Sequence, residues 1–188
     1  MIRESTFAPV TQWTEPTVAE VAAVFALLKD HGYDANQLAS VTGLQQKNVN
    51  LWTARYRNEP DNISSIPYPC WCFLSALVGR PNIQSGGEAI QVNVRRVLSY
   101  FKPTAFRPND KYVSPTSEQF SHLIDNENYE TLTTENLSQI FDWSSKHFTF
   151  GITQGSLSFL NWSLIVMNLG IDIQKMILKD LHGDLSVG

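Results

Sequence analysis

Apolar residues near the N-terminus recur at steps of three and four, which places them on one face of a helix. These residues are Val18, Val21, Ala22, Phe25 and Leu28. Thr17 and Glu20 have the spacing of a capping box at the start of this stretch, and Gly32 is a natural helix terminator at its end. The pattern predicts an amphipathic helix between Thr17 and Gly32.

Two shorter helices joined by a tight turn are predicted to follow. Asp34 can cap the first of them, with Gln37 three residues later. Gly43 supplies the backbone freedom that the turn requires, and the next helix begins at about Gln45. The residues expected to face the core of this pair are Leu38, Val41, Val49 and Trp52.

The chain repeats itself at an offset of 99 residues. The matches include Phe7 with Phe106, Pro9 with Pro108, Trp13 with Tyr112, Leu38 with Leu137, Val41 with Ile140, Lys47 with Lys146 and Val49 with Phe148. The offset then shortens by eight residues, so that residues 66–79 correspond to residues 157–170. Two copies of a unit this long are typical of a duplicated small domain rather than of a solenoid.

The second copy is predicted to fold in the same way. Thr116 and Gln119 repeat the capping-box spacing, and either Thr133 or Thr134 can cap the next helix. Asp142 stands where the first copy has its turn glycine, and Asp tolerates left-handed geometry better than most residues. Ser144 can cap the helix after the turn. The apolar residues expected to pack are Phe120, Leu123, Ile124, Leu137, Ile140 and Phe141.

Residues 39–52 resemble the helix-turn-helix of the Cro/C1-type phage repressor family. In that pattern Ala39 packs where the helices cross, Gly43 makes the turn, and Leu44, Val49 and Trp52 hold the two helices together. Residues 66–77 are expected to supply the short apolar helix that follows in the family. The alternative is an ordinary three-helix packing unit with a glycine in its turn. The resemblance implies a repressor-like protein that binds pseudo-palindromic DNA as a dimer. A tandem protein could instead place its own two units on one site, but the acidic second half favours the homodimer.

The polar face of the helix after Gly43 carries the candidate DNA contacts. They are Gln45, Gln46, Lys47, Asn48, Asn50, Thr53, Arg55 and Arg57. Gln and Asn pair bidentately with adenine in the major groove, while Arg and Lys suit guanine or phosphate. This end of the helix enters the groove in the motif. The alternative is that these side chains are the solvated face of an amphipathic helix.

The second copy offers a weaker candidate surface, made of Ser144, Ser145, Lys146 and His147. It has no glycine in the turn, and its surroundings are acidic. Residues 1–108 contain ten Lys and Arg against eight Asp and Glu, whereas residues 109–188 contain four against ten. Because DNA affinity depends on phosphate neutralisation, we expect this copy to be degenerate and to serve packing, dimerisation or partner binding.

Two segments outside the repeated motif have less definite patterns. Residues 88–101 have nearly helical spacing but are rich in branched residues, which leaves a β-strand open. We expect a helix there that closes the first unit. Residues 174–181 are expected to form a short final helix.

Residues typical of catalysis or metal binding do not converge in the sequence. His31, His122, His147 and His182 are scattered, and Cys70 and Cys72 sit too close for a structural disulfide. We therefore expect no enzyme activity, no bound metal and no cofactor. No apolar run approaches the roughly 18 residues that cross a bilayer, and the cysteines fit a reducing cytoplasm.

Together these patterns predict a mainly α-helical protein with two tandem domains, residues 1–104 and residues 105–188, each a helix-turn-helix bundle related by internal duplication. The predicted function is sequence-specific transcriptional regulation, repressor-like and from a mobile element, by a cytoplasmic homodimer on double-stranded DNA.

The main alternative is a non-catalytic protein-interaction module or inhibitor on the same fold. The net charge of −4 favours it, as do Phe148 and Phe150, both expected to be exposed. A continuous positive patch joining Lys47, Arg55, Arg57 and Arg95 would favour DNA instead. An RNA-binding role is weaker, because the chain lacks a basic stripe with interleaved aromatic residues.

Overall fold

The computed structural model describes residues 1–55, 58–81, 90, 92–107, 111–124 and 132–174. This part of the chain is mainly α-helical, which confirms the predicted fold class. The α-helices are α1 (Val18–Asp30), α2 (Ala35–Thr42), α3 (Gln46–Arg55), α4 (Tyr68–Leu77), α5 (Val94–Tyr100), α6 (Ser117–Ile124), α7 (Thr134–Gln139), α8 (Ser145–Thr153) and α9 (Phe159–Asn168). The short 3-10 helices are η1 (Glu4–Phe7), η2 (Val10–Gln12) and η3 (Pro103–Phe106).

Short-range hydrogen bonds start the helices where the sequence predicted. Reciprocal capping pairs join Thr17 with Glu20, Asp34 with Gln37, and Thr116 with Gln119. Thr133, rather than Thr134, caps α7 by accepting a hydrogen bond from the Asn136 N–H. Ser144 caps α8 by accepting one from the His147 N–H. These caps satisfy backbone N–H groups that would otherwise have no partner at each helix start.

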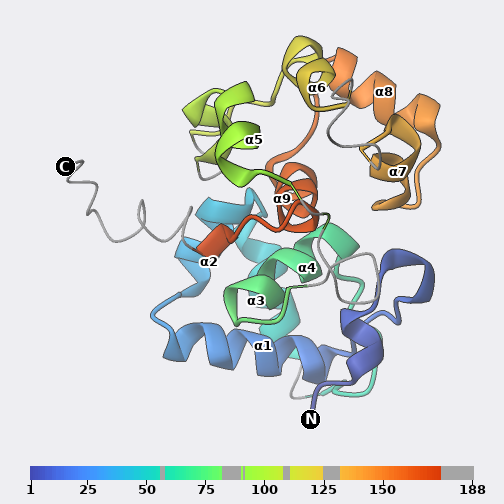
Figure 1. Cartoon of the computed structure of the whole chain (residues 1–188). Helices are drawn as coiled ribbons and strands as arrows, with labels where there is room; N and C mark the ends of the chain where they lie inside the picture. The colour runs from blue at the N-terminus through green and yellow to red at the C-terminus, as the bar shows by residue number, and fades with distance from the viewer. Residues whose placement is uncertain (56–57, 82–89, 91, 108–110, 125–131, 175–188) are drawn as a thin grey trace.

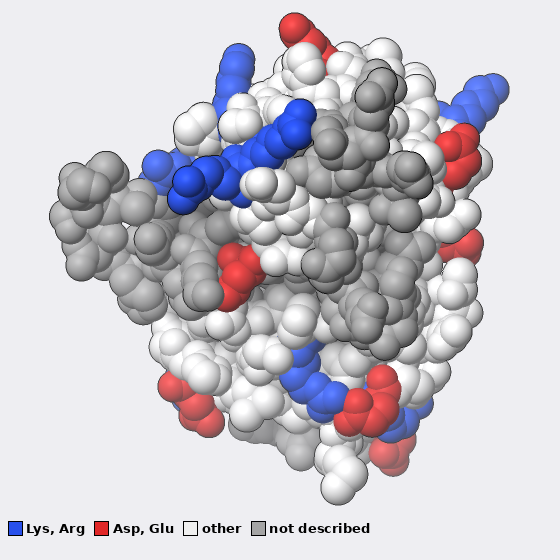
Figure 2. All heavy atoms as spheres, in the orientation of Figure 1, with Lys and Arg blue, Asp and Glu red and all other residues white. Residues whose placement is uncertain are grey.

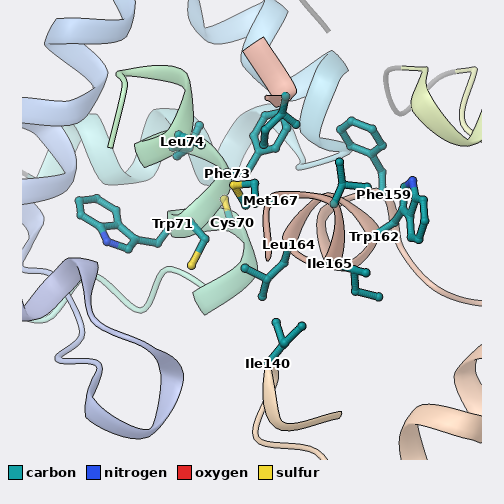
Figure 3. Packing of buried hydrophobic residues seen from close by; sticks show 14 of the residues in the cluster. Cys70, Trp71, Phe73, Leu74, Ile140, Phe159, Trp162, Leu164, Ile165 and Met167 are labelled. Atoms are coloured by element: carbon teal, nitrogen blue, oxygen red, sulfur yellow. The ribbon is translucent and has the colours of Figure 1, made fainter. Parts of the chain in front are cut away.

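Helices α4 and α9 pack against each other at the centre of the molecule, with α1 on one side and α5, α6 and α8 on the other (Figure 1). Residues 70–77 of α4 and residues 162–168 of α9 are all buried. The rings of Phe73 and Phe159 are 5.6 Å apart. Figure 3 shows Leu164 and Met167 of α9 on the side of that helix that faces α4. Buried residues from both halves belong to one cluster, so the two predicted units share a hydrophobic core.

Helices in the two halves begin at the offsets of the sequence repeat. The first residues of α1 and α6, of α2 and α7, and of α3 and α8 are each 99 positions apart, and those of α4 and α9 are 91 apart. Ring contacts recur as well. Trp13 and Tyr68 pack edge to face with centroids 5.1 Å apart, and Tyr112 and Phe159 pack the same way at 5.5 Å. These helix starts and this ring contact therefore have the same spacing in the two halves.

The sequence predicted that the helix in residues 88–101 closes the first unit, and this prediction is wrong for α5. It packs on α6 in the second half, and Phe101, just after it, lies 5.8 Å from Phe120 and 4.8 Å from Trp162 between ring centroids. The segment is a helix from Val94 to Tyr100 rather than a strand, while residues 82–89 and 91 lie outside the described residues. The branched residues of this segment were compatible with either a helix or a strand. The packing of α5 on α6 comes with contacts to aromatic rings that are distant in the sequence.

The end of the second half is attached to α4 of the first. The side-chain Nε2 of Gln174 donates hydrogen bonds to the carbonyl oxygens of Ala76 and Leu77, both at 2.8 Å. These carbonyls lie in the last turn of α4, and the Ala76 carbonyl also accepts a hydrogen bond from the Gly79 N–H at 3.0 Å. Of the helix predicted for residues 174–181, only Gln174 belongs to the described residues.

An ion pair holds the N-terminal segment on α1. Arg3 donates from Nε to Glu20 Oε1 at 2.9 Å and from Nη2 to Glu20 Oε2 at 2.7 Å. The Thr17 N–H also donates to Glu20 Oε2, at 2.8 Å. Burial alone would raise the pKa of Glu20, but the hydrogen bonds from Arg3 and Thr17 lower it to about 2. The carboxylate therefore stays ionised although its residue is only 5% exposed.

Replacing Glu20 with Gln is expected to lower the free energy of unfolding at pH 7 by about 1–3 kcal/mol, because charged hydrogen bonds are lost while Arg3 is partly screened by water. The pKa of Glu20 falls from 4.5 to about 2 on folding, so its contribution is present above pH 4.5 and lost as the pH falls towards 2. Urea titrations at several pH values should show the two proteins converge over this range. Glu118→Gln, at an exposed position of α6, is the control. A Glu20→Gln difference independent of pH would contradict the role of the carboxylate.

Candidate nucleic-acid interface

A tight turn at Gly43 joins α2 to α3. Gly43 has a left-handed backbone with φ of 72°, and its N–H donates to the Ala39 carbonyl at 2.9 Å. The buried Thr42 hydroxyl donates to the Leu38 carbonyl at 2.6 Å and accepts a hydrogen bond from the Leu44 N–H at 3.3 Å. Because glycine adopts this conformation without a steric penalty, the predicted turn forms as expected.

One side of α3 is held in the core. Val49 is fully buried, and Trp52 is 5% exposed with its ring 6.4 Å from that of Phe25 on α1. The indole Nε1 of Trp52 donates to the Ser64 carbonyl at 3.1 Å. These contacts fix the rotation of α3 about its axis, and its opposite side faces solvent.

The solvent side of α3 brings together most of the predicted site residues. Gln45, Lys47 and Asn50 are exposed, while Gln46 and Asn48 are half-buried. The Gln46 side chain donates from Nε2 to Asn50 Oδ1 at 3.1 Å, which aligns two amides along the helix. Thr53 and Arg55 lie further along α3, but their side chains and the whole of Arg57 lie outside the described residues.

Leu51 also lies on this side, and sequence reasoning did not select it. It is 52% exposed, although leucine in this position of an amphipathic helix is usually buried. Its exposure adds an apolar contact point beside the amides. The signal in the sequence was its position two residues after Val49, which puts the two residues on different faces of the helix.

The second half contains the corresponding turn between α7 and α8. Asp142 takes the place of Gly43 and has a left-handed φ of 56°. The four predicted residues Ser144, Ser145, Lys146 and His147 follow directly, with Ser145 half-buried and the other three exposed. The turn therefore forms without glycine, at the cost of placing a side chain in a strained backbone conformation.

Trp143 gives the second turn an aromatic surface that the sequence analysis missed. Its ring stacks on His147 with centroids 4.6 Å apart and planes 4° apart, and on Phe141 at 4.6 Å. Phe148 is completely buried, so the prediction that it is exposed was wrong: its ring packs beside Phe141 and Phe120. Phe150 is 64% exposed, as predicted. The alternation of Phe148 and Phe150 around a helix was the available signal, because residues two apart face different sides.

Positive charge on the face drawn in Figure 2 gathers over α5. Lys and Arg atoms lie next to each other there, and α5 carries the exposed residues Arg95 and Arg96. Asp and Glu atoms occur elsewhere on the same face. Lys47 and Arg95, two members of the predicted patch, are exposed. The other two members of the predicted patch are Arg55 and Arg57. The side chain of Arg55 and the whole of Arg57 lie outside the described residues, and so does the continuity of the patch.

Other chemistry is sparse in the part of the chain that the structure describes. No group of three or more His, Cys, Asp or Glu side chains is arranged to hold a metal ion there. Cys70 and Cys72 lie in the core and form no disulfide, and burial raises the pKa of Cys70. A hollow of about 330 Å³ lies at the ends of α4 and α9, lined mainly by apolar residues together with Asp172 and Gln174. Among the described residues, no helix has the length and apolar content to span a membrane.

Comparison of the chain with models of known protein families, with curated proteins and with solved structures finds no significant match. The function is therefore inferred from the geometry of the two helix pairs, the chemistry of their surfaces and the resemblance of residues 39–52 described above.

Proposed function

We propose that the protein is a sequence-specific DNA-binding transcriptional regulator, and that the solvent side of α3 makes its base contacts. The supporting observation is the pair α2 and α3. Gly43 sets the turn and the core holds Val49 and Trp52, so the other side of α3 presents a fixed row of polar side chains. A repressor-like role is the part of the proposal that rests on the family resemblance.

The chemistry of the exposed side suits the major groove. Gln46, Asn48 and Asn50 carry the amide group that pairs with the N6 and N7 edge of adenine. Lys47 suits guanine or a phosphate, and the exposed Leu51 suits a thymine methyl group. The ten residues of α3 span about 15 Å, which is a length that the major groove accommodates.

Substitutions on α3 are expected to separate base contacts from phosphate contacts. Gln46→Ala or Asn48→Ala should relax sequence preference and cost about 1–3 kcal/mol of discrimination if the amide contacts a base. Lys47→Ala should weaken binding to every sequence and reduce the salt slope by about 0.9. Fluorescence anisotropy with a duplex selected from a random library, at several salt concentrations, measures both effects.

Lys29→Ala is the matched control, because it removes an exposed cation in the last turn of α1 rather than on α3. Its affinity and salt slope should equal those of the unchanged protein. Failure of the intact protein to retain any duplex at low salt would reject the proposed function.

The homodimer, the cytoplasmic location and the absence of catalysis stay predictions. A protein-interaction module or inhibitor is the second candidate function. Phe150, 64% exposed on α8, favours it, because a large exposed aromatic ring is typical of a protein contact. Under this function the intact protein would not retain DNA, and Phe150→Ser would abolish capture of a protein partner.

A further inference from the structure

We propose that one chain occupies a whole two-part DNA site, with α3 on one part and the exposed side of α8 on the other. This inference rests on the proposed DNA-binding function. It assigns a role to the second half and defines the site as two unlike parts rather than a palindrome.

The first support is the pairing of α4 with α9. These helices occupy corresponding positions in the two halves, since Tyr68 and Phe159 begin them at the offset of the sequence repeat. A symmetric dimer forms when the same patch of two subunits meets itself. Here the two corresponding patches meet within one polypeptide, so the chain already contains an arrangement that other proteins obtain from two subunits.

The second support is that this contact is fully buried. Residues 70–77 of α4 and 162–168 of α9 are inaccessible, and Gln174 adds hydrogen bonds to the last turn of α4. A second copy of the chain cannot use this face without opening the common core. The surface by which two identical units would pair is already occupied.

The third support is the state of the second turn. Asp142 keeps the left-handed backbone of Gly43, and Ser144 caps α8, so the first residues of α3 and α8 follow a left-handed residue at the same spacing although α7 ends earlier than α2. Asp is one of the few residues besides glycine that tolerate this conformation, so the second turn keeps its left-handed residue although the glycine is absent. Lys146, His147 and Thr149 are exposed beyond the turn.

The surface of α8 differs in chemistry from that of α3. The exposed residues of α8 are Lys146, His147, Thr149, Phe150 and Thr153, whereas α3 presents amides, an ammonium group and Leu51. The imidazole of His147 is held flat against Trp143, which reduces the conformational freedom that it would lose on binding. Side chains this different select different bases, so the two parts of the site should differ in sequence.

Acidic residues oppose the approach of this half to DNA. Among the described residues of the second half, the acids are Glu118, Glu135, Asp142 and Asp172, and all four are exposed. Of these, only Asp142 belongs to the turn between α7 and α8. We therefore expect the contact through α8 to be the weaker of the two and the protection of the DNA to be unequal along the site.

The test uses the whole protein and a duplex selected by it from a random library. Analytical ultracentrifugation should find one chain per duplex. Hydroxyl-radical footprinting should then show that Lys47→Ala loses protection in one part of the site only, and that Lys146→Ala loses it in the other part only. Each substitution should reduce the steepness of the fall of log affinity with log salt by about 0.9, because each removes one phosphate contact.

Lys111→Ala is the matched control, since it removes an exposed cation that belongs to neither helix pair. It should leave both parts of the footprint unchanged. Two chains per duplex, with Lys47→Ala weakening both parts equally, would overturn the inference and favour a homodimer. A footprint and salt slope unaffected by Lys146→Ala would overturn it as well. Both results would leave DNA binding through α3 intact, whereas absence of any DNA binding would reject the proposed function itself.

Discussion

Replacing Trp162 with alanine is expected to unfold both halves of the protein together. Trp162 is 1% exposed, and its ring lies 4.8, 5.8 and 5.5 Å from those of Phe101, Phe106 and Phe120. Removal of a buried tryptophan costs about 3–5 kcal/mol, and a domain has only about 5–15 kcal/mol in total. Because α9 packs on α4, the first half loses its support when the second half opens.

Urea denaturation followed by far-UV circular dichroism and by tryptophan fluorescence measures this effect. The two signals should coincide, with the Trp162→Ala midpoint far below that of the unchanged protein. Phe150→Ala is the control, since a ring that is 64% exposed should contribute less than about 0.5 kcal/mol. Two separate transitions, with the first half still folded after the second has melted, would show that the halves are independent.

Gly43→Val is expected to destabilise the turn between α2 and α3 and to weaken DNA binding. Gly43 has a φ of 72°, a conformation in which a β-branched side chain clashes with its own backbone. The expected loss is about 1–3 kcal/mol of unfolding free energy. Relief of the strain would rotate α3 relative to α2, so affinity for the selected duplex should fall more than stability alone explains.

Gly43→Asn separates strain from the mere presence of a side chain. Asn tolerates left-handed geometry, and Asp142 already occupies the corresponding turn with a φ of 56°. Gly43→Asn should therefore keep most of the stability and of the DNA affinity. Thermal melting and anisotropy on the three proteins provide the comparison. Equal affinity of Gly43→Val and the unchanged protein would contradict a role for the turn in positioning α3.

Features set by neighbouring residues could be predicted from the sequence. The capping pair of Asp34 with Gln37 forms within one turn of helix, and the left-handed turns at Gly43 and Asp142 depend on backbone preference alone. The buried stripe of α1 follows from helical periodicity in the same way. These features place the candidate DNA-contacting side of α3 without reference to the rest of the fold.

Features set by distant contacts could not be predicted. Nothing local in residues 94–100 shows that α5 packs on α6, and the apolar stretches of α4 and α9 did not show that they would meet each other. Phe148 was misplaced for a related reason, since its burial depends on Phe120 and Phe141 from two other helices. Trp143 was overlooked because a residue just before a helix cap has no periodic partner in the sequence.

The pairing of α4 and α9 inside one polypeptide has consequences for how the protein responds to its own abundance. An association between separate subunits is lost on dilution, because it depends on their concentration. A pair within one chain is complete once that chain has folded, so dilution leaves it intact. In a symmetric assembly each mutation also appears twice, whereas here it alters one surface and leaves the other unchanged. The sides of α3 and α8 can therefore evolve separately, and the combination of amides on one and stacked aromatic rings on the other is a result that identical subunits cannot produce.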